Sequence, residues 1–384
     1  MQNFVYNIPT KIYFGKGEEL KIGKLIKEYN AHKVLIHFGS NRVKKTGLIA
    51  RIEKCLKQEN IKYIELGGVR PNPILSHVRK GISLCKKEKV DFVLAVGGGS
   101  VLDSAKAIAI GVANPKIDIW NVFLGKFMPK KSLPKAGIIT IAAAGSEMSN
   151  SMVITNEETN EKRGFNDVIA QMDFSIENPD LATSVSYYQV ACGAVDIAMH
   201  TMERYFSPGK HTELTDALAL AVIKTVNEVS PKVLKNPKDY DARANMMWAS
   251  SVAHNGLTGF GRDVRFVVHP FGHQVCGLYP NIAHAPGLSA IWGSWARYVY
   301  KYDLKRWKVF AKEIWGTDDV LKAIKKQEEY YHKIGMPISL RELKVKKSDL
   351  NKMALRLSKN KTSQIIAVKN LKYEDMLKIY KSAY

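Results

Sequence analysis

The sequence is poor in cysteine. Its four cysteines are spread over 384 residues, and no two of them have the CxxC spacing (Cys55, Cys85, Cys192 and Cys276). This distribution argues against a zinc knuckle and against a disulfide framework. The sequence also lacks an apolar run long enough to cross a bilayer, and its first residues lack the basic-then-apolar order of a signal peptide. We therefore expect a cytoplasmic protein with no membrane partner.

Acidic residues are also scarce relative to basic ones. Lysine and arginine number 58 against 36 aspartates and glutamates, which gives a formal net charge of +22. A surplus of this size can indicate nucleic-acid binding. Here the lysines are scattered over helical segments, and no basic tract interleaved with aromatic residues accompanies them. We interpret the charge as a solvated surface that can attract an anionic cofactor, and we expect no nucleic-acid partner.

The chain has no internal repeat, but it changes character near residue 185. Before that point, short β-branched runs alternate with amphipathic segments, which predicts a parallel sheet built from βαβ units. The expected strands are 33–38, 61–66, 91–96 and 137–143, and helices are expected over 46–58, 74–88 and 97–113. After residue 185, long segments have helical periodicity. The fold class predicted is α/β plus all-α, with an α/β domain over 1–184 and a helical domain over 185–384.

A glycine-rich loop stands where a predicted strand meets a helix, in "LAVGGGSVLDSAK". It fits neither the GxGxxG fingerprint nor the Walker A pattern. Gly97, Gly98 and Gly99 allow a close backbone approach to a bulky anion, and a helix N-terminus attracts phosphate. We expect Ser100 to cap that helix and Asp103 to lie in its first turn. A tight connection without any ligand is the alternative interpretation.

No acidic residue follows the first predicted strand. Gly39, Ser40 and Asn41 stand there, where an aspartate or glutamate would bind the ribose of NAD and repel a 2′-phosphate. The pattern favours NADP(H) over NAD(H), although a polar loop without a ligand would look the same.

Histidines gather in one part of the second half of the chain. Asp196 and His200 are four residues apart and share a helix face, and His269, His273 and His284 follow in one window. About four such ligands suit Fe(II) or Zn(II), which leaves one residue for proton transfer. The alternative is that these are ordinary packed or exposed side chains.

The motifs occur together in an order that resembles a known family. "NIPTKIYFGKG", "GGVRPNP", "AVGGGSVLDSAK", "AAAGSEMSNSMVIT", "NPDLATSV", "GAVDIAMHTMERYF" and the histidine window follow the order seen in iron-containing (group III) alcohol dehydrogenases. The resemblance runs from about residue 3 to the C-terminus and is closest to the NADPH-dependent butanol dehydrogenase branch. It implies a Rossmann-like N-terminal domain and a helical C-terminal domain, the dehydroquinate synthase-like architecture.

The resemblance also implies roles for individual residues. The metal ligands would be Asp196, His200, His269 and His284, with His273 as the catalytic histidine near the nicotinamide. The cofactor-binding residues would be Gly39, Ser40, Asn41, Asn72, Gly97, Gly98, Gly99, Ser100, Asp103, Thr140 and Lys162. His284 is followed by Ala285, whereas members of the family often have glycine there.

The implied activity is hydride transfer between NADP(H) and a short- to medium-chain alcohol or aldehyde, with Fe(II) or Zn(II) as the metal. The family also suggests a homo-oligomer, most simply a dimer. A polyol or glycerol-type dehydrogenase of the same superfamily is the main alternative. A basic nucleic-acid-associated protein and a catalytically inert metal-binding scaffold are two further alternatives.

Overall fold

The computed structural model describes residues 1–143 and 145–384, so Ala144 of the "AAAGSE" motif lies outside the described residues. The chain forms two compact units, which we call the sheet unit (Asn7–Val185) and the helical unit (Met1–Tyr6 with Ser186–Tyr384). The first six residues therefore pack with the helical unit, although the sequence-based division assigned them to the sheet. Their aromatic side chains explain this, because Phe4 stacks on Phe260 at a ring distance of 4.9 Å.

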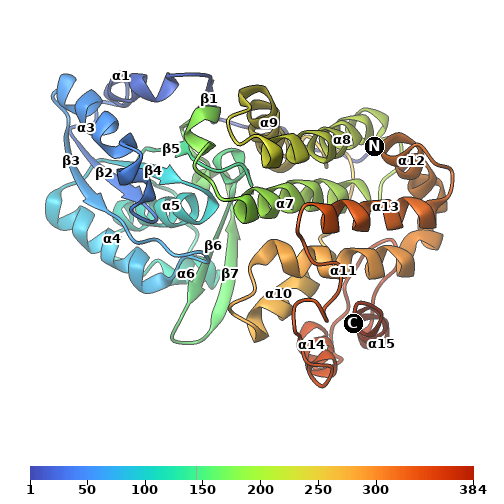
Figure 1. Cartoon of the computed structure of the whole chain (residues 1–384). Coiled ribbons are helices and arrows are strands. Elements are labelled where there is room, and N and C mark those ends of the chain that lie inside the picture. Colours follow the sequence, from blue (N-terminus) through green and yellow to red (C-terminus); the bar gives the residue numbers. More distant parts are fainter. Residues whose placement is uncertain (144) are drawn as a thin grey trace. The chain divides into compact units, whose positions relative to one another are not determined.

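The sheet unit is built on a six-stranded parallel sheet (Figure 1). The strand order is β1-β8-β5-β4-β2-β3. The strands are β1 (Lys11–Phe14), β2 (Lys33–Phe38), β3 (Lys62–Leu66), β4 (Phe92–Gly97), β5 (Lys135–Ile139) and β8 (Phe174–Glu177). The helices of this unit are α1 (Ile22–Lys27), α2 (Arg42–Lys45), α3 (Leu48–Gln58), α4 (Leu75–Glu88), α5 (Gly99–Ala113) and α6 (Trp120–Phe123). The predicted α/β fold with a parallel sheet is confirmed.

The central strands are the ones that the sequence predicts best. In β4 every residue is buried, and in β2 all but the first are buried, as expected for a parallel sheet that is covered on both faces. The strand predicted over 137–143 instead spans Lys135–Ile139. Thr140 N still donates to Gly97 O at 3.1 Å, but the chain then leaves the ladder. The sequence analysis missed β1, β8 and an antiparallel hairpin of β6 (Ser151–Asn156) and β7 (Glu161–Asn166).

A buried lysine ties α5 to the segment before the hairpin. The ammonium group of Lys106 donates to the carbonyl oxygens of Ser146 (2.7 Å), Ser149 (3.0 Å) and Ser151 (2.8 Å). Burial lowers the pKa of Lys106 to about 8, although Asp103 and Glu147 partly oppose this effect. One side chain therefore satisfies three backbone acceptors, two of which are buried and one partly buried.

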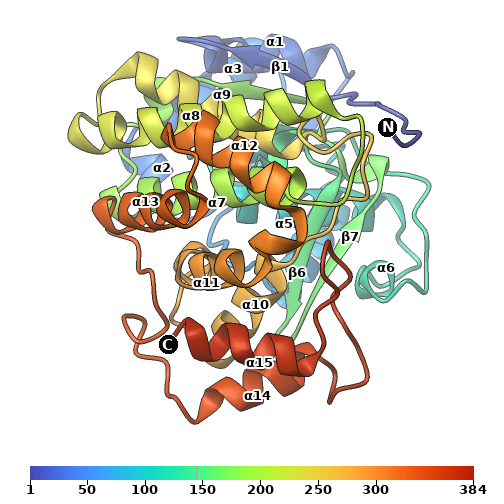
Figure 2. The same cartoon turned by 90° about the vertical axis from the view of Figure 1, so that its right-hand side faces the viewer.

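The helical unit is all-α, as predicted. Its helices are α7 (Tyr187–Tyr205), α8 (Glu213–Lys235), α9 (Tyr240–His254), α10 (Val268–Leu278), α11 (His284–Val299), α12 (Leu304–Trp315), α13 (Val320–Lys333), α14 (Asp349–Leu357) and α15 (Tyr373–Ser382). Figure 2 shows α14 and α15 side by side near the C-terminus. The middle of α7 is buried on all sides, which is why its sequence is apolar around the polar residues discussed below.

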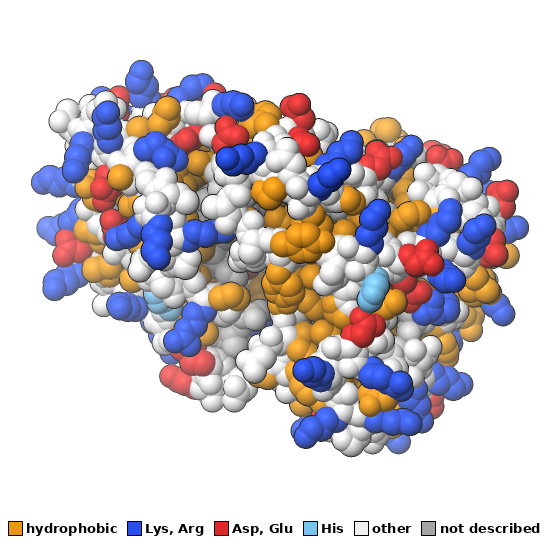
Figure 3. All heavy atoms as spheres, viewed as in Figure 1, with side chains coloured by type: hydrophobic (Ala, Val, Ile, Leu, Met, Phe, Trp, Pro, Cys, Tyr) orange, Lys and Arg blue, Asp and Glu red, His pale blue; other side chains and the backbone are white. Residues whose placement is uncertain are grey.

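The surface agrees with the scattered lysines of the sequence. On the face drawn in Figure 3, lysine and arginine side chains are dispersed and interspersed with acidic ones. None of the helices in the described part of the chain has the length and apolar character needed to span a membrane.

Candidate functional site

Helix α7 presents a buried polar stripe. Asp196, His200 and Glu203 follow one another at spacings of four and three residues, so they lie on one face of the helix. All three are buried, and the Glu203 side chain is fully inaccessible to solvent. Ser186 fixes the start of the helix, because its hydroxyl oxygen accepts from the Gln189 backbone N–H. One helix thus holds three buried ionisable groups on the same face.

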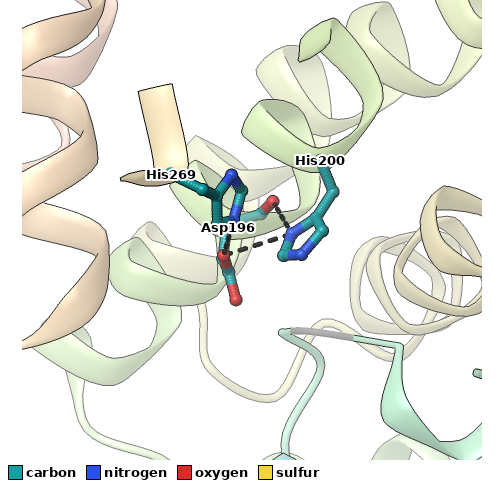
Figure 4. A group of neighbouring side chains, drawn as sticks. All are labelled: Asp196, His200 and His269. Carbon is teal, nitrogen blue, oxygen red and sulfur yellow. Dashed lines mark hydrogen bonds and ion pairs between the residues drawn. The ribbon is translucent and has the colours of Figure 1, made fainter. Parts of the chain in front are cut away.

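A third candidate ligand comes from α10. His269 lies in the first turn of that helix, and Figure 4 shows its side chain next to those of Asp196 and His200. One potential ligand atom from each of these residues lies within 4.8 Å of the others. The distance from His269 Nε2 to Asp196 Oδ1 is 3.8 Å. Two ligand atoms of one tetrahedral zinc ion would be about 3.4 Å apart, so the spacing suits a shared metal ion.

Hydrogen bonds fix the tautomers of both imidazoles. His200 Nδ1 lies 2.9 Å from the carbonyl oxygen of Asp196, which can only accept, so Nδ1 donates. His269 Nδ1 is bonded in the same way to the carboxylate of Glu203. When either ring is neutral, its lone pair is therefore on Nε2, the atom through which it can bind a metal, as is usual for metal-ligating histidines.

The electrostatics of the cluster favour a cation. Burial raises the pKa of Asp196, but the nearby imidazoles of His200, His269 and His284 outweigh burial and hold this pKa well below its usual range. Burial lowers the pKa of His269, but Glu203 and Asp196 outweigh it and raise the pKa to about 9. Two buried carboxylates therefore stabilise positive charge at this position.

Two buried polar atoms of the cluster lack a hydrogen-bond partner. They are Asp196 Oδ1 and His269 Nε2. Such atoms are costly in a folded protein unless an ion or water binds them. Their positions and chemistry fit a divalent metal ion bound between the two side chains.

The other two histidines of the window lie beside this cluster. His284 is the first residue of α11, and its Nε2 is 3.9 Å from Asp196 Oδ1. The ring of His273 stacks on that of His284 at 5.1 Å and lies edge-on to His269 at 6.2 Å. The structure thus brings together all five residues that the sequence singled out. Their roles as ligands and as proton carrier stay predictions.

Sequence reasoning missed two buried residues of α7, Glu203 and Arg204. Arg204 donates to the His200 carbonyl oxygen at 2.9 Å and to His254 Nδ1 at 2.6 Å. The His254 ring lies 4.5 Å from that of His200. The spacing of Asp196, His200 and Glu203 could have identified Glu203, whereas nothing in the sequence points to the pairing of Arg204 with His254.

In the sheet unit, the predicted cofactor residues follow the carboxyl ends of neighbouring strands. Gly39 comes directly after β2, Gly97 ends β4, and Thr140 comes directly after β5. In a parallel sheet these ends share one edge, which is where such folds bind nucleotides. The structure corrects two details, because α5 begins at Gly99 with Gly98 as its N-cap. Ser100 is therefore inside the helix rather than its cap, and Asp103 lies beyond the first turn.

Three further predicted cofactor residues have partners within the sheet unit. Lys162 Nζ donates to Asn72 Oδ1 at 2.8 Å, so the structure brings this pair together. The Asp103 carboxylate accepts from the Ser146 hydroxyl at 2.8 Å and from Val153 N at 3.0 Å. Asp103 thus joins α5 to Ser146 and to β6.

Comparison with known proteins identifies the family. The family model "Iron-containing alcohol dehydrogenase" matches residues 9–179, and the model "Fe-containing alcohol dehydrogenase family, C-terminal" matches residues 190–384. The chain belongs to the iron-containing alcohol dehydrogenase family. It is therefore an oxidoreductase of the NAD(P)-dependent alcohol dehydrogenase type, and membership implies a metal and a nicotinamide cofactor.

Relatives within the family differ in the cofactor that they are named for. The NADH-dependent butanol dehydrogenase A of Clostridium acetobutylicum is 38% identical, with 100% of both chains covered. The NADPH-dependent aldehyde reductase YqhD of Escherichia coli is 32% identical, again with 100% of both covered. The crystal structure of the NADH-dependent butanol dehydrogenase A of Thermotoga maritima matches with a TM-score of 0.94 and 37% identity, covering 100% of this chain and 99% of the other.

Proposed function

We propose that this alcohol dehydrogenase interconverts short- to medium-chain aldehydes and alcohols with NADP(H), using Fe(II) or Zn(II) held by Asp196, His200, His269 and His284. The observation that carries the proposal is the pair of buried atoms without hydrogen-bond partners, Asp196 Oδ1 and His269 Nε2, beside His200. The butanol dehydrogenase and aldehyde reductase relatives support the substrate class.

Each residue has a defined part in this chemistry. When bound, the metal supplies a Lewis acid for the substrate oxygen, and the nicotinamide supplies or accepts the hydride. Asp196 provides negative charge, and the imidazoles of His200 and His269 present Nε2 because their Nδ1 atoms are already engaged. We assign to His273 the delivery of a proton to the product oxygen during aldehyde reduction, because an imidazole can exchange protons near neutral pH.

The proposed preference for NADP(H) depends on Gly39, Ser40 and Asn41. No carboxylate follows β2 at these positions, so nothing there would repel a 2′-phosphate. The names of the relatives are divided on this point, which makes the preference worth testing directly. A Cβ at Gly39 would lie 3.4 Å from Val69 O and 3.5 Å from a methyl group of Val101, so a Cβ fits there in ordinary van der Waals contact.

The test is the reduction of butanal with NADPH and, separately, with NADH. We expect a higher kcat/KM with NADPH, and we expect Gly39→Asp to shift the ratio toward NADH. Gly39→Asn is the matched neutral control and should leave the preference with NADPH. A wild-type preference for NADH would reject the cofactor assignment, and faster turnover of glycerol than of butanol would favour the polyol dehydrogenase alternative. A homo-oligomer, most simply a dimer, is proposed from the family and is tested by light scattering.

A further inference from the structure

Glu203 is a buried carboxylate beside the proposed metal ligands. It follows His200 by three residues on α7, and its side chain is fully inaccessible to solvent. A carboxylate in such a place destabilises the fold unless hydrogen bonds satisfy it. The hydrogen-bond partners of the Glu203 carboxylate therefore indicate what this residue does in the site.

The hydrogen bonds that the structure gives to the Glu203 carboxylate all come from the N-terminal end of α10. Oε1 accepts from the backbone N–H of Val267 at 2.5 Å and from that of His269 at 3.1 Å. Oε2 accepts from the side-chain Nδ1 of His269. Glu203 thus binds two of the N–H groups that a helix start leaves without an intrahelical partner, and it also holds the imidazole.

We infer that Glu203 is the positioning residue that makes His269 a metal ligand, an inference that rests on the proposed metal-dependent function. It joins the α10 ligand to the two α7 ligands, Asp196 and His200. It fixes the backbone of His269 through one oxygen and the ring through the other. A carboxylate bound to Nδ1–H directs the lone pair of Nε2 toward the metal and makes the imidazole a stronger donor.

The amide of glutamine cannot replace this carboxylate. An amide has one accepting oxygen and one donating NH2 group, whereas the three partners of Glu203 all donate. If the amide oxygen keeps the two backbone N–H groups, the NH2 group of glutamine faces Nδ1–H of His269, so two donors oppose each other. The His269 ring is then favoured in the tautomer that carries its proton on Nε2, the atom that would bind the metal. If the oxygen turns to Nδ1, the two backbone donors lose their acceptor.

The test compares Glu203→Gln with Glu328→Gln in the full-length protein. Glu328 is a matched control, because it is a buried glutamate of the helical unit whose partner is Arg297. Zn(II) affinity is measured by competition with a chromophoric chelator, and the visible spectrum of the Co(II) form reports the ligand geometry. We expect Glu203→Gln to weaken Zn(II) binding about 10- to 100-fold and to alter the Co(II) spectrum, as for other partners of ligating histidines. Glu328→Gln should change neither.

A second variant covers the case in which Glu203→Gln does not fold. Glu203→Asp keeps the charge but is one methylene shorter, so it cannot reach all three donors, and it should also weaken Zn(II) binding. Wild-type affinity and spectrum in either folded variant would overturn the inference while leaving the proposed function intact. A wild-type protein that binds neither Zn(II) nor Co(II) would overturn the proposed function, and this inference with it.

Discussion

Replacing Asp196 by asparagine should abolish most of the stabilisation that a bound metal gives to the protein. Asp196 Oδ1 lies 3.2 Å from His200 Nδ1, 3.8 Å from His269 Nε2 and 3.9 Å from His284 Nε2, so it is central to the cluster. Asparagine has the same size but lacks the charge. Metal affinity should fall at least about 100-fold, since even indirect partners of metal ligands contribute 10- to 100-fold.

The size of the effect follows from mass action. At a metal concentration 100 times the wild-type Kd, binding stabilises the native state by about 2.7 kcal/mol. At the same concentration, a variant with about 100-fold weaker affinity gains only about 0.4 kcal/mol. The difference of about 2.3 kcal/mol corresponds to roughly 5–9 °C in Tm for a domain of about 200 residues.

The assay is thermal unfolding of the metal-free and Zn(II)-loaded proteins. Asp318→Asn is the control, because Asp318 is an exposed aspartate of the same helical unit. We expect the wild type and Asp318→Asn to show the full metal-dependent rise in Tm, and Asp196→Asn to show almost none. An undiminished rise in Asp196→Asn would refute the assignment of Asp196 as a ligand.

Three further predictions concern pH, the buried lysine and the glycine loop. Because the pKa of His269 is raised to about 9 in the metal-free protein, chelator competition should show Zn(II) affinity rising about tenfold per pH unit up to about pH 9. The raised pKa of His269 also means that its protonation stabilises the metal-free fold. This contribution is complete below pH 6.5, and denaturant titrations should show that it disappears toward pH 9. Lys106→Met leaves two buried carbonyl oxygens and one partly buried carbonyl oxygen without their donor, and it should lower the free energy of unfolding by about 1–3 kcal/mol in urea titrations. An unchanged midpoint would contradict this. Gly98→Ala places a Cβ against Ile141 and should weaken NADPH binding in fluorescence titrations, whereas Gly164→Ala, whose nearest contact is 3.8 Å away, should bind normally.

The sequence predicts the parts of the fold that carry strong local patterns. The strand at 33–38 matches β2 in full, and the helix predicted over 74–88 differs from α4 by one residue. Strands β1 and β8 were missed because each has only four residues and because β1 pairs with a strand about 160 residues away. The β6–β7 hairpin escaped notice because β7 is largely polar and mostly exposed.

The candidate site was predictable only in part, because many of its contacts join residues that are far apart in the sequence. Asp196 and His200 stand out because one helix sets their spacing, whereas His269 joined them only through the histidine window and the family resemblance. The contacts of Glu203 with Val267 and His269 span 64 and 66 residues, and no local pattern encodes such a pairing. Helix packing decides these contacts, so they became visible only in three dimensions.

The most direct test of metal-dependent alcohol dehydrogenase activity is a titration of the metal-free protein with Fe(II) under anaerobic conditions, followed by butanal-dependent oxidation of NADPH. We predict no turnover without metal and a linear rise in activity that ends at one Fe(II) per chain. Full activity in the metal-free protein, or no activity at any Fe(II) or Zn(II) loading, would contradict the proposed site and the mechanism based on it.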